Sequence, residues 1–232
     1  MNPQYCKWHP DVETYIQCNR CDTPVCVECR KDAPVGFHCR DCMQDARSSV
    51  RRIKVRKATV TRVIIGICLA IFLLDSAGSG DLFVQFGVNQ IAITEFGEYY
   101  RLITAMFIHG SIIHIAFNML ILFQFGSAIE EFIGSARFTL LYFAAGLGGS
   151  VASFLFNNPF AFSVGASGAI FGLMGAFLII GRRMNYPTNQ VLGLLAINIV
   201  LGFVLPNIDW YGHFGGLVVG LAVGAGLNLQ RR

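Results

Sequence analysis

Apolar residues dominate six stretches of the chain, and each stretch is close to the length of a membrane-crossing helix. About 20 consecutive apolar residues form a helix that crosses the roughly 30 Å hydrocarbon core of a bilayer. The pattern therefore predicts an all-α polytopic membrane protein. The predicted spans are 58–76, 111–129, 137–156, 167–182, 189–206 and 211–229.

The segments between the predicted spans differ in length and polarity. Residues 77–110 form a long loop with amphipathic stretches such as 82–86, which we expect to lie in the membrane interface rather than to cross it. The short fourth span begins at Ser167, and we expect a re-entrant loop before it, since irregular backbone is tolerated where it lines a cavity.

Composition and charge divide the chain into two domains. Apolar residues make up 54% of the chain and charged residues 14%, against roughly 25% charged residues in soluble proteins. Residues 1–57 hold most of the charge and seven of the eight Cys. We expect a small Cys-rich domain over 1–45, a basic linker over 46–57 and a membrane domain over 58–232. The N-terminus is polar, so the first apolar run is expected to stay as an anchor.

Lys and Arg residues indicate the orientation of the six spans. With six spans, the basic residues before the first span and those at Arg137, Arg182 and Arg183 fall on one side, which the positive-inside rule makes cytoplasmic. We therefore expect a multi-pass protein of the cell membrane with both termini in the cytoplasm. The cations of the linker are suited to anionic lipid headgroups.

The first domain contains four pairs of metal-ligating residues, and two residues separate the members of each pair. Structural zinc takes four N or S ligands in a tetrahedron, so the eight residues suit two Zn²⁺ ions. Disulfides are disfavoured because cytoplasmic thiols stay reduced. The pairs are Cys6 and His9, Cys18 and Cys21, Cys26 and Cys29, and Cys39 and Cys42.

A second group of polar residues lies inside the apolar spans. Ser167 and His213 each stand at the start of a predicted helix, and His114 and Asn118 lie four residues apart on one face of a third helix, which Ser111 can cap. Polar side chains are rare in hydrocarbon and mark functional sites there. A hydroxyl, an imidazole and an amide at one depth are the parts of a serine hydrolase.

Small residues at four-residue spacing favour close packing of the two helices that carry Ser167 and His213. Such spacing lets helix backbones approach in lipid. Phe171, one turn after Ser167, is placed to pack against the His213 ring. The small residues are Gly168, Gly172 and Ala176 in one span and Gly212, Gly216, Gly220 and Gly224 in the other.

Residues 58–230 resemble the rhomboid family of intramembrane serine proteases. The resemblance rests on the GxSG sequence at 165–168, on His213 with its glycine stripe, on the HxxxxHxxxN sequence at 109–118, and on residues 98–101, Glu-Tyr-Tyr-Arg, which resemble the aromatic-Arg signature of the first outer loop. It implies Ser167 as nucleophile, His213 as general base, and His114 and Asn118 as oxyanion donors. It also implies transmembrane protein substrates, a lipid bilayer as surroundings and no cofactor for catalysis.

This sequence departs from the family pattern at three positions without losing a reacting group. Tyr100 stands where Trp is common, Phe171 where Tyr often supports the histidine, and Gly212 where Ala often precedes it.

Other polar residues near these motifs have structural interpretations that we prefer to catalytic ones. Asp209 lies at a loop edge, and His109 is expected to support the outer loop or the cavity. We expect Arg101 to stabilise the loop or bind headgroups, and Glu130 and Glu131 to form a solvated cytoplasmic turn.

The ligand spacing of the first domain resembles a B-box type zinc finger, whose ligand pairs alternate between two ions. The resemblance implies one ion on Cys6, His9, Cys26 and Cys29 and a second on Cys18, Cys21, Cys39 and Cys42. His38 in place of Cys39 is an open alternative. We expect a folding unit or a platform for a cytoplasmic protein partner, and no nucleic-acid binding.

Two functional classes fit these residues. The first is a serine-type endopeptidase acting inside the membrane through a Ser-His dyad. The alternative is a catalytically silent rhomboid-like protein that holds membrane clients without cleaving them. The presence of both Ser167 and His213 favours the enzyme. A broken-helix transporter is disfavoured because this sequence shows no sign of the inverted repeat that such folds contain.

Overall fold

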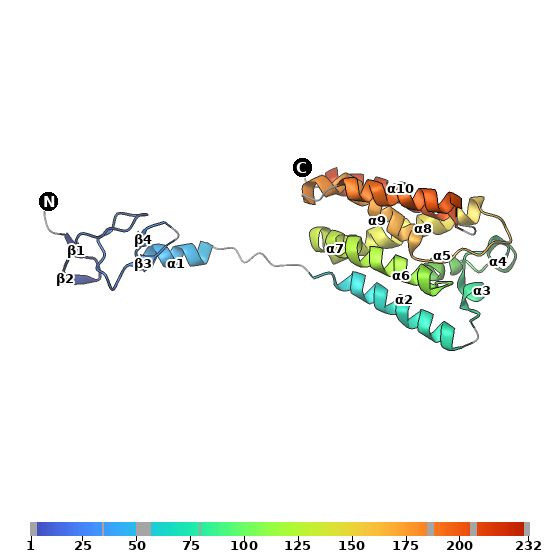
Figure 1. The fold of residues 1–232 in the computed structure, drawn as a ribbon, viewed down its shortest axis with the longest axis horizontal. Helices are drawn as coiled ribbons and strands as arrows, with labels where there is room; N and C mark the ends of the chain where they lie inside the picture. The colour runs from blue at the N-terminus through green and yellow to red at the C-terminus, as the bar shows by residue number, and fades with distance from the viewer. Residues whose placement is uncertain are drawn as a thin grey trace. The chain divides into compact units, whose positions relative to one another are not determined.

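A computed structural model describes residues 4–33, 35–49, 57–78, 80–184, 188–204 and 208–229. The chain divides into two compact units, residues 1–54 and 55–232 (Figure 1). Most of the linker expected over 46–57 lies outside the described residues.

The first unit is a small fold of two hairpins and a helix. The strands pair antiparallel, β1 with β2 and β3 with β4. The helix α1 ends at Ser49 and so continues past residue 45, where we expected the domain to end. The elements are β1 (Gln4–Cys6), β2 (His9–Thr14), β3 (Lys31–Asp32), β4 (Phe37–His38) and α1 (Arg40–Ser49).

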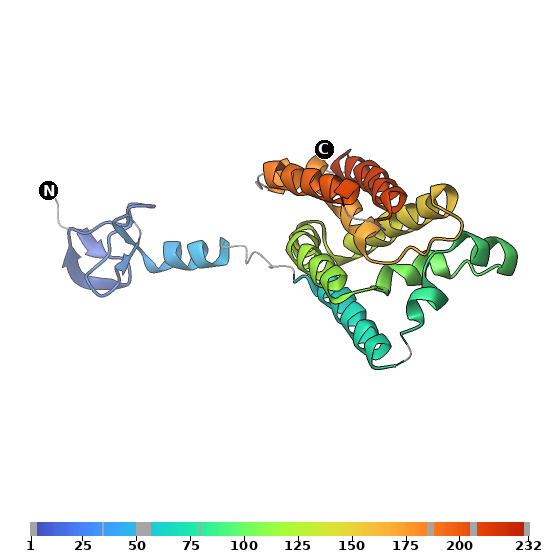
Figure 2. The same ribbon diagram turned by 45° about the vertical axis from the view of Figure 1, so that its right-hand side comes forward.

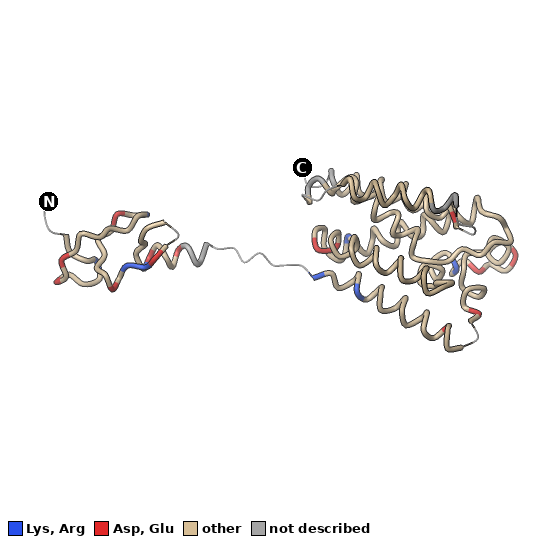
Figure 3. Tube along the Cα trace, viewed as in Figure 1, with Lys and Arg blue, Asp and Glu red and all other residues tan. Residues whose placement is uncertain are grey.

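The second unit is helical. Among its described residues, four helical stretches are long and apolar enough to cross a membrane: 59–77, 112–133, 135–156 and 210–227; two shorter apolar helices cover 167–180 and 188–200. Charged residues are sparse along these helices (Figure 3). The α-helices are α2 (Thr59–Ala77), α3 (Leu82–Phe86), α4 (Gln90–Phe96), α5 (Arg101–Thr104), α6 (Ile112–Ile121), α7 (Ser127–Ile133), α8 (Ser135–Phe156), α9 (Ser167–Ile180), α10 (Thr188–Val204) and α11 (Trp210–Leu229).

Short 3-10 and π-helical turns join or extend several of these helices. A π-helical turn, η2 (Leu122–Gly126), makes α6 and α7 one continuous helix. The 3-10 turn η1 (Ala105–Phe107) follows α5, and η3 (Gly181–Met184) follows α9. The second predicted span, 111–129, thus extends to Ile133.

Helix α9 is the centre of the second unit. It packs against α8, α10 and α11, and every residue from Ala169 to Phe177 is buried. A helix that is apolar on all sides is stable only when it is surrounded. Its 14 residues span about 21 Å, less than the roughly 30 Å hydrocarbon core, so α9 leaves part of the membrane depth unfilled.

Three short helices lie near the start of α9. α3, α4 and α5 gather at the end of the unit where α6, α9 and α11 begin (Figures 1 and 2). Arg101 holds this region together: it is 7% exposed, pairs with Glu98, and donates to the backbone carbonyls of Val84 and Gly87. These contacts are those of the loop-stabilising role expected for Arg101, and they bury its guanidinium within the protein.

Glycines allow α9 and α11 to touch through their backbones. A Cβ at Gly216 would collide with the carbonyl oxygen of Gly168, and one at Gly220 would collide with that of Gly172. The stripe of small residues in the sequence therefore corresponds to direct backbone contact.

Glu130 corrects one expectation from the sequence. It is fully buried rather than solvated, whereas its neighbour Glu131 is exposed. The Glu130 carboxylate accepts hydrogen bonds from the backbone N–H groups of Val60 and Thr61 and from the hydroxyls of Thr61 and Ser135. The carboxylate accepts hydrogen bonds from N–H groups that have no acceptor within the first turn of α2. These donors and the helix dipole stabilise the buried charge.

Replacing Glu130 by Gln should destabilise the second unit. The amide keeps the size but loses the charge, and its NH₂ group faces donors, so charge-assisted hydrogen bonds worth about 1.5–3 kcal/mol each are lost or weakened. The measurement is thermal unfolding in detergent, with Glu131→Gln as the matched control. Equal melting temperatures of the two variants would contradict the structural role of Glu130.

Candidate functional site

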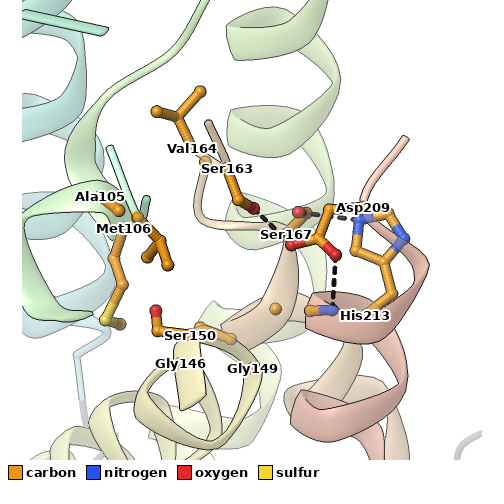
Figure 4. A pocket seen from close by; sticks show the side chains of 15 residues that line it. Ala105, Met106, Gly146, Gly149, Ser150, Ser163, Val164, Ser167, Asp209 and His213 are labelled. Carbon is orange, nitrogen blue, oxygen red and sulfur yellow. Dashed lines mark hydrogen bonds between the residues drawn. The ribbon is translucent and has the colours of Figure 1, made fainter. Parts of the chain in front are cut away.

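The hydroxyl of Ser167 and the imidazole of His213 lie together. Ser167 is the first residue of α9 and His213 lies in the first turn of α11. Ser167 Oγ and His213 Nε2 are 2.9 Å apart, within hydrogen-bond distance (Figure 4). The backbone contacts between α9 and α11 bring these two side chains, 46 residues apart, to one point.

Phe171 fixes the plane of the histidine ring. The two rings are stacked, with centroids 4.2 Å apart and an angle of 8° between their planes. This is the packing that the sequence predicts for Phe171. The stacked phenyl ring restricts rotation of the imidazole and keeps Nε2 directed at Ser167.

The turn before Ser167 places Gly165 against His114. Gly165 has φ of 118°, a conformation that side chains rarely adopt. A Cβ at Gly165 would lie 2.7 Å from His114 Nε2, so the imidazole occupies the space that any other residue would fill. Gly165 also donates its N–H to the carbonyl of Ala105, which anchors the turn.

Helix α6 presents His114 and Asn118 to the same cavity. The hydroxyl of Ser111 accepts the N–H of His114 and so caps this helix, as predicted. Asn118 Nδ2 donates to the His114 carbonyl at 2.9 Å, while its Oδ1 is buried without a hydrogen-bond partner among the described residues. One N–H of the Asn118 amide is thus occupied by its own helix.

His109 stands behind His114 rather than in the cavity lining. It is 3% exposed, and its ring meets the His114 ring edge to face with centroids 5.1 Å apart. Burial lowers the pKa of the His109 imidazole to about 4, so the ring is neutral at pH 7. This position agrees with the supporting role expected from the sequence.

A cavity of about 890 Å³ opens in front of these groups. It is enclosed by α6, α9, α10, the start of α11 and the segment before Ser167. Its size suits a few residues of extended peptide together with water. The polar side chains that line it include Ser111, His114, Asn118, Asn157, Asn158, Ser163, Ser167, Asn198, Asp209 and His213.

Sequence reasoning missed a second polar pair beside Ser167 and His213. Ser163 Oγ donates a hydrogen bond to Asp209 Oδ2 (Figure 4). From the sequence Asp209 is expected at a loop edge, and no motif marks Ser163. Both residues also line a small cavity of about 20 Å³ that reaches Ser167 and His213.

The first unit brings the eight predicted ligand residues into two groups of four. Within each group the ligand atoms all lie within 4.8 Å of one another: Cys6, His9, Cys26 and Cys29 form one group, and Cys18, Cys21, Cys39 and Cys42 the other. This grouping is the one that the B-box resemblance implies, and it contains Cys39 rather than His38.

The distances within these groups fit a metal. Cys21 and Cys39 Sγ are 3.7 Å apart, and His9 Nδ1 lies 3.2 and 3.4 Å from the Sγ atoms of Cys26 and Cys29. A tetrahedron with Zn–S bonds of about 2.3 Å has edges of about 3.8 Å. All eight cysteines lie in the described residues and are free of disulfides.

The fold and the site define a polytopic helical membrane protein with a serine and a histidine facing a cavity. Residues 96–229, more than half of the chain, match the family described as the rhomboid domain. The chain belongs to the rhomboid family.

Relatives of this chain include proteins named as proteases. Rhomboid protease GluP of Bacillus subtilis is 40% identical over 184 residues, which are 75% of this chain and 36% of that protein. RHOMBOID-like protein 6, mitochondrial, of Arabidopsis thaliana is 39% identical over 60% of this chain and 47% of its own length. Putative rhomboid protease YdcA of Bacillus subtilis is 36% identical over 53% of this chain and 65% of its own length. The chain therefore spans between about a third and two thirds of the length of these relatives.

Proposed function

We propose that this protein is an intramembrane serine endopeptidase that cleaves transmembrane proteins through a dyad of Ser167 and His213. The observation that carries the proposal is the 2.9 Å approach of Ser167 Oγ to His213 Nε2 at the edge of a polar cavity. A hydroxyl is a weak nucleophile until an adjacent base takes its proton. Membership in a family with named proteases supports the same reading.

In the proposed reaction His213 removes the proton of Ser167 as the hydroxyl oxygen attacks the scissile carbonyl. The tetrahedral intermediate collapses when His213 gives that proton to the leaving amine, which produces an acyl-enzyme on Ser167. Water then enters through the cavity, His213 takes one of its protons, and hydrolysis of the ester restores the serine. Stacking on Phe171 replaces the third residue that holds the histidine in a triad.

The oxyanion is stabilised by groups that surround Ser167. These are the backbone N–H of Ser167, which at the start of α9 has no acceptor within its own helix, the imidazole of His114 and the amide of Asn118. Donors aimed at the developing charge are worth on the order of 10²–10³ in rate each.

Replacing Asn118 by Ala should slow cleavage by about 10²-fold or less, because His114 and the backbone donor remain. The turnover number with a single-span reporter measures this effect. Ile113→Ala, on the same helix and cavity, is the control for packing changes. An unchanged turnover number in the Asn118 variant would remove the amide from the oxyanion site.

We infer that Ser167 opens to the outer side of the membrane and that both termini are cytoplasmic. The basic residues before α2 and those at Arg137 and in 182–183 support this orientation through the positive-inside rule. The helices α6, α9 and α11 begin at the opposite end, where α3, α4 and α5 gather.

Cleavage sites should cluster at or just outside the outer boundary of single-span substrates. A helix hides its carbonyls in hydrogen bonds, so the substrate must unwind before attack. Gly and Pro ease unwinding by roughly 1 and 3 kcal/mol relative to Ala, and the glycines around Ser167 favour a small residue at the cut. Mass spectrometry of the product termini measures the position. Cuts at the cytoplasmic end would overturn the inferred orientation.

Labelling with a fluorophosphonate probe tests the proposed function directly. An activated serine reacts with the probe, whereas a rhomboid-like protein that only holds its clients does not. We expect one labelled site, at Ser167, and loss of labelling in His213→Ala. A purified protein that neither labels nor cleaves any single-span reporter would refute the protease assignment.

We propose further that the first unit is a B-box-like zinc finger with two structural Zn²⁺ ions. Its apolar core is small: Val25 is fully buried, and Trp8 and Ile16 pack against the cysteines. A core of this size rarely stabilises a domain of about 50 residues without a metal or disulfides. A cytoplasmic protein partner of this unit stays a prediction from the sequence.

A further inference from the structure

Ser163 and Asp209 form a second side-chain contact next to that of Ser167 and His213. Ser163 precedes Ser167 by four residues, and Asp209 precedes His213 by the same number. The hydroxyl of Ser163 donates to Asp209 Oδ2, so a second polar contact joins the segments that carry the dyad (Figure 4). Two links thus run side by side between the start of α9 and the start of α11.

Asp209 is fixed to α11 as well as to Ser163. Its Oδ1 accepts the N–H of Gly212 at 2.9 Å, and its backbone carbonyl accepts the N–H of His213 at 3.2 Å. A carboxylate at a helix start is stabilised by the unpaired N–H groups and by the helix dipole. Among the described residues no hydrogen bond joins Asp209 to the His213 ring, so the hydrogen-bonded connection between them runs through the first turn of α11.

Ser163 is held from the other side by the segment between α3 and α4. Its N–H donates to the carbonyl of Val88 and its carbonyl accepts the N–H of Val88, both at 2.9 Å. The next residue, Asn89, donates its amide to the carbonyls of Pro159 and Ala161 at 3.1 Å. The backbone of Ser163 is therefore fixed before its hydroxyl meets Asp209.

Gly212 provides the space that this contact needs. A Cβ at position 212 would lie 2.6 Å from Asp209 Oδ2, so a larger residue would push the carboxylate aside. Ala, which the resemblance places at this position in many rhomboids, would have to displace Asp209. Glycine at position 212 therefore leaves room for the Asp209 carboxylate.

The faces of α9 and α11 meet along glycine backbones, as at Gly168 with Gly216 and at Gly172 with Gly220. Side chains also contact across this face, since Phe171 of α9 stacks on His213 of α11. A hydrogen bond between Ser167 and His213 needs a defined position of one helix along the other. The hydrogen bond between Ser163 and Asp209 fixes that position at the ends of the helices that carry Ser167 and His213.

We propose that Ser163 and Asp209 form a clamp that positions His213 against Ser167. Both are positioning residues, and neither reacts. The inference rests on the proposed protease function for its catalytic consequence. Misplacement of reacting groups by about 1 Å reduces rates by about 10²-fold, so loss of the clamp should lower turnover while leaving substrate binding in the cavity largely intact.

The test is a double-variant cycle of Ser163→Ala and Asp209→Ala in the full chain, with cleavage kinetics and thermal unfolding measured in detergent. We expect kcat to fall by about 10-fold to 100-fold in each single variant, with KM changed by less than about 2-fold. The double variant should be no slower than Asp209→Ala. Asp209→Asn, which can accept from Gly212 and donate to Ser163, should recover most of the rate. Ser76→Ala, which removes a serine hydrogen bond in α2, is the control.

Each result decides one question. Losses of melting temperature that do not add in the double variant support the clamp, whether or not the protein is active. Additive losses, or an unchanged kcat in an active Ser163→Ala protein, overturn it. If the unaltered protein neither cleaves a reporter nor reacts with a fluorophosphonate, the protease proposal fails, while the unfolding cycle still accepts or rejects the contact itself.

Discussion

Replacing Ser167 by Ala should abolish cleavage of a transmembrane reporter, and so should replacing His213 by Ala. Without the hydroxyl no acyl-enzyme forms, and without the imidazole nothing takes the proton of Ser167 at neutral pH. Because the two groups act as a unit, each loss should reduce turnover by at least about 10⁴-fold, and the double variant should be no slower than either single one. Turnover of purified protein measures this.

The same variants should remain folded. Ser167 makes its side-chain contact with His213 at the cavity edge, and the surrounding glycine contacts of α9 and α11 do not depend on either side chain. We therefore expect melting temperatures close to that of the unaltered protein, and normal turnover in the control Ser76→Ala. Cleavage by purified Ser167→Ala protein would place the nucleophile elsewhere.

The sequence predicts the apolar helices and the approach of Ser167 to His213 because both depend on local patterns. Apolar runs mark the spans, since the bilayer sets their length. The meeting of Ser167, His213 and Phe171 could be predicted because each residue has a fixed position on its helix. Small residues at four-residue spacing in both helices indicate that these two helices touch.

Polar contacts between distant segments were the part that the sequence did not reveal. Glu130 reads as a solvated turn residue because it follows a span and precedes another acidic residue, yet it caps α2, about 70 residues away in the chain. No periodicity connects a carboxylate to the backbone N–H groups of another helix. The burial of Glu130 depends on the tertiary position of α2.

The contact between Ser163 and Asp209 could not be predicted from the sequence either, although one half of it, the capping position of Asp209, could. Asp209 three residues before Gly212 is a recognisable helix-capping position. Its second oxygen, however, is satisfied by a serine in a loop whose course depends on Val88 and Asn89. The equal four-residue offset from Ser167 and His213 was the only trace of this pairing in the sequence.

Removing zinc should unfold the first unit while the second unit stays folded. Elemental analysis should find two zinc ions per chain, and a strong chelator should abolish the fold of a fragment covering residues 1–49. Binding of structural zinc contributes about 10–16 kcal/mol at pH 7, more than the small core of Val25, Trp8 and Ile16 can replace. Circular dichroism of the fragment with and without metal measures the loss.

The two ligand groups can be separated by single substitutions. Cys26→Ser should remove one zinc and Cys18→Ser the other, because each residue belongs to a different group of four. His38→Ala should keep both ions, since the second group contains Cys39. The membrane unit contains neither group, so the thermal unfolding of its helices should be unchanged in all three variants. Less than one zinc per chain in the unaltered protein, or loss of an ion in His38→Ala, would contradict this assignment.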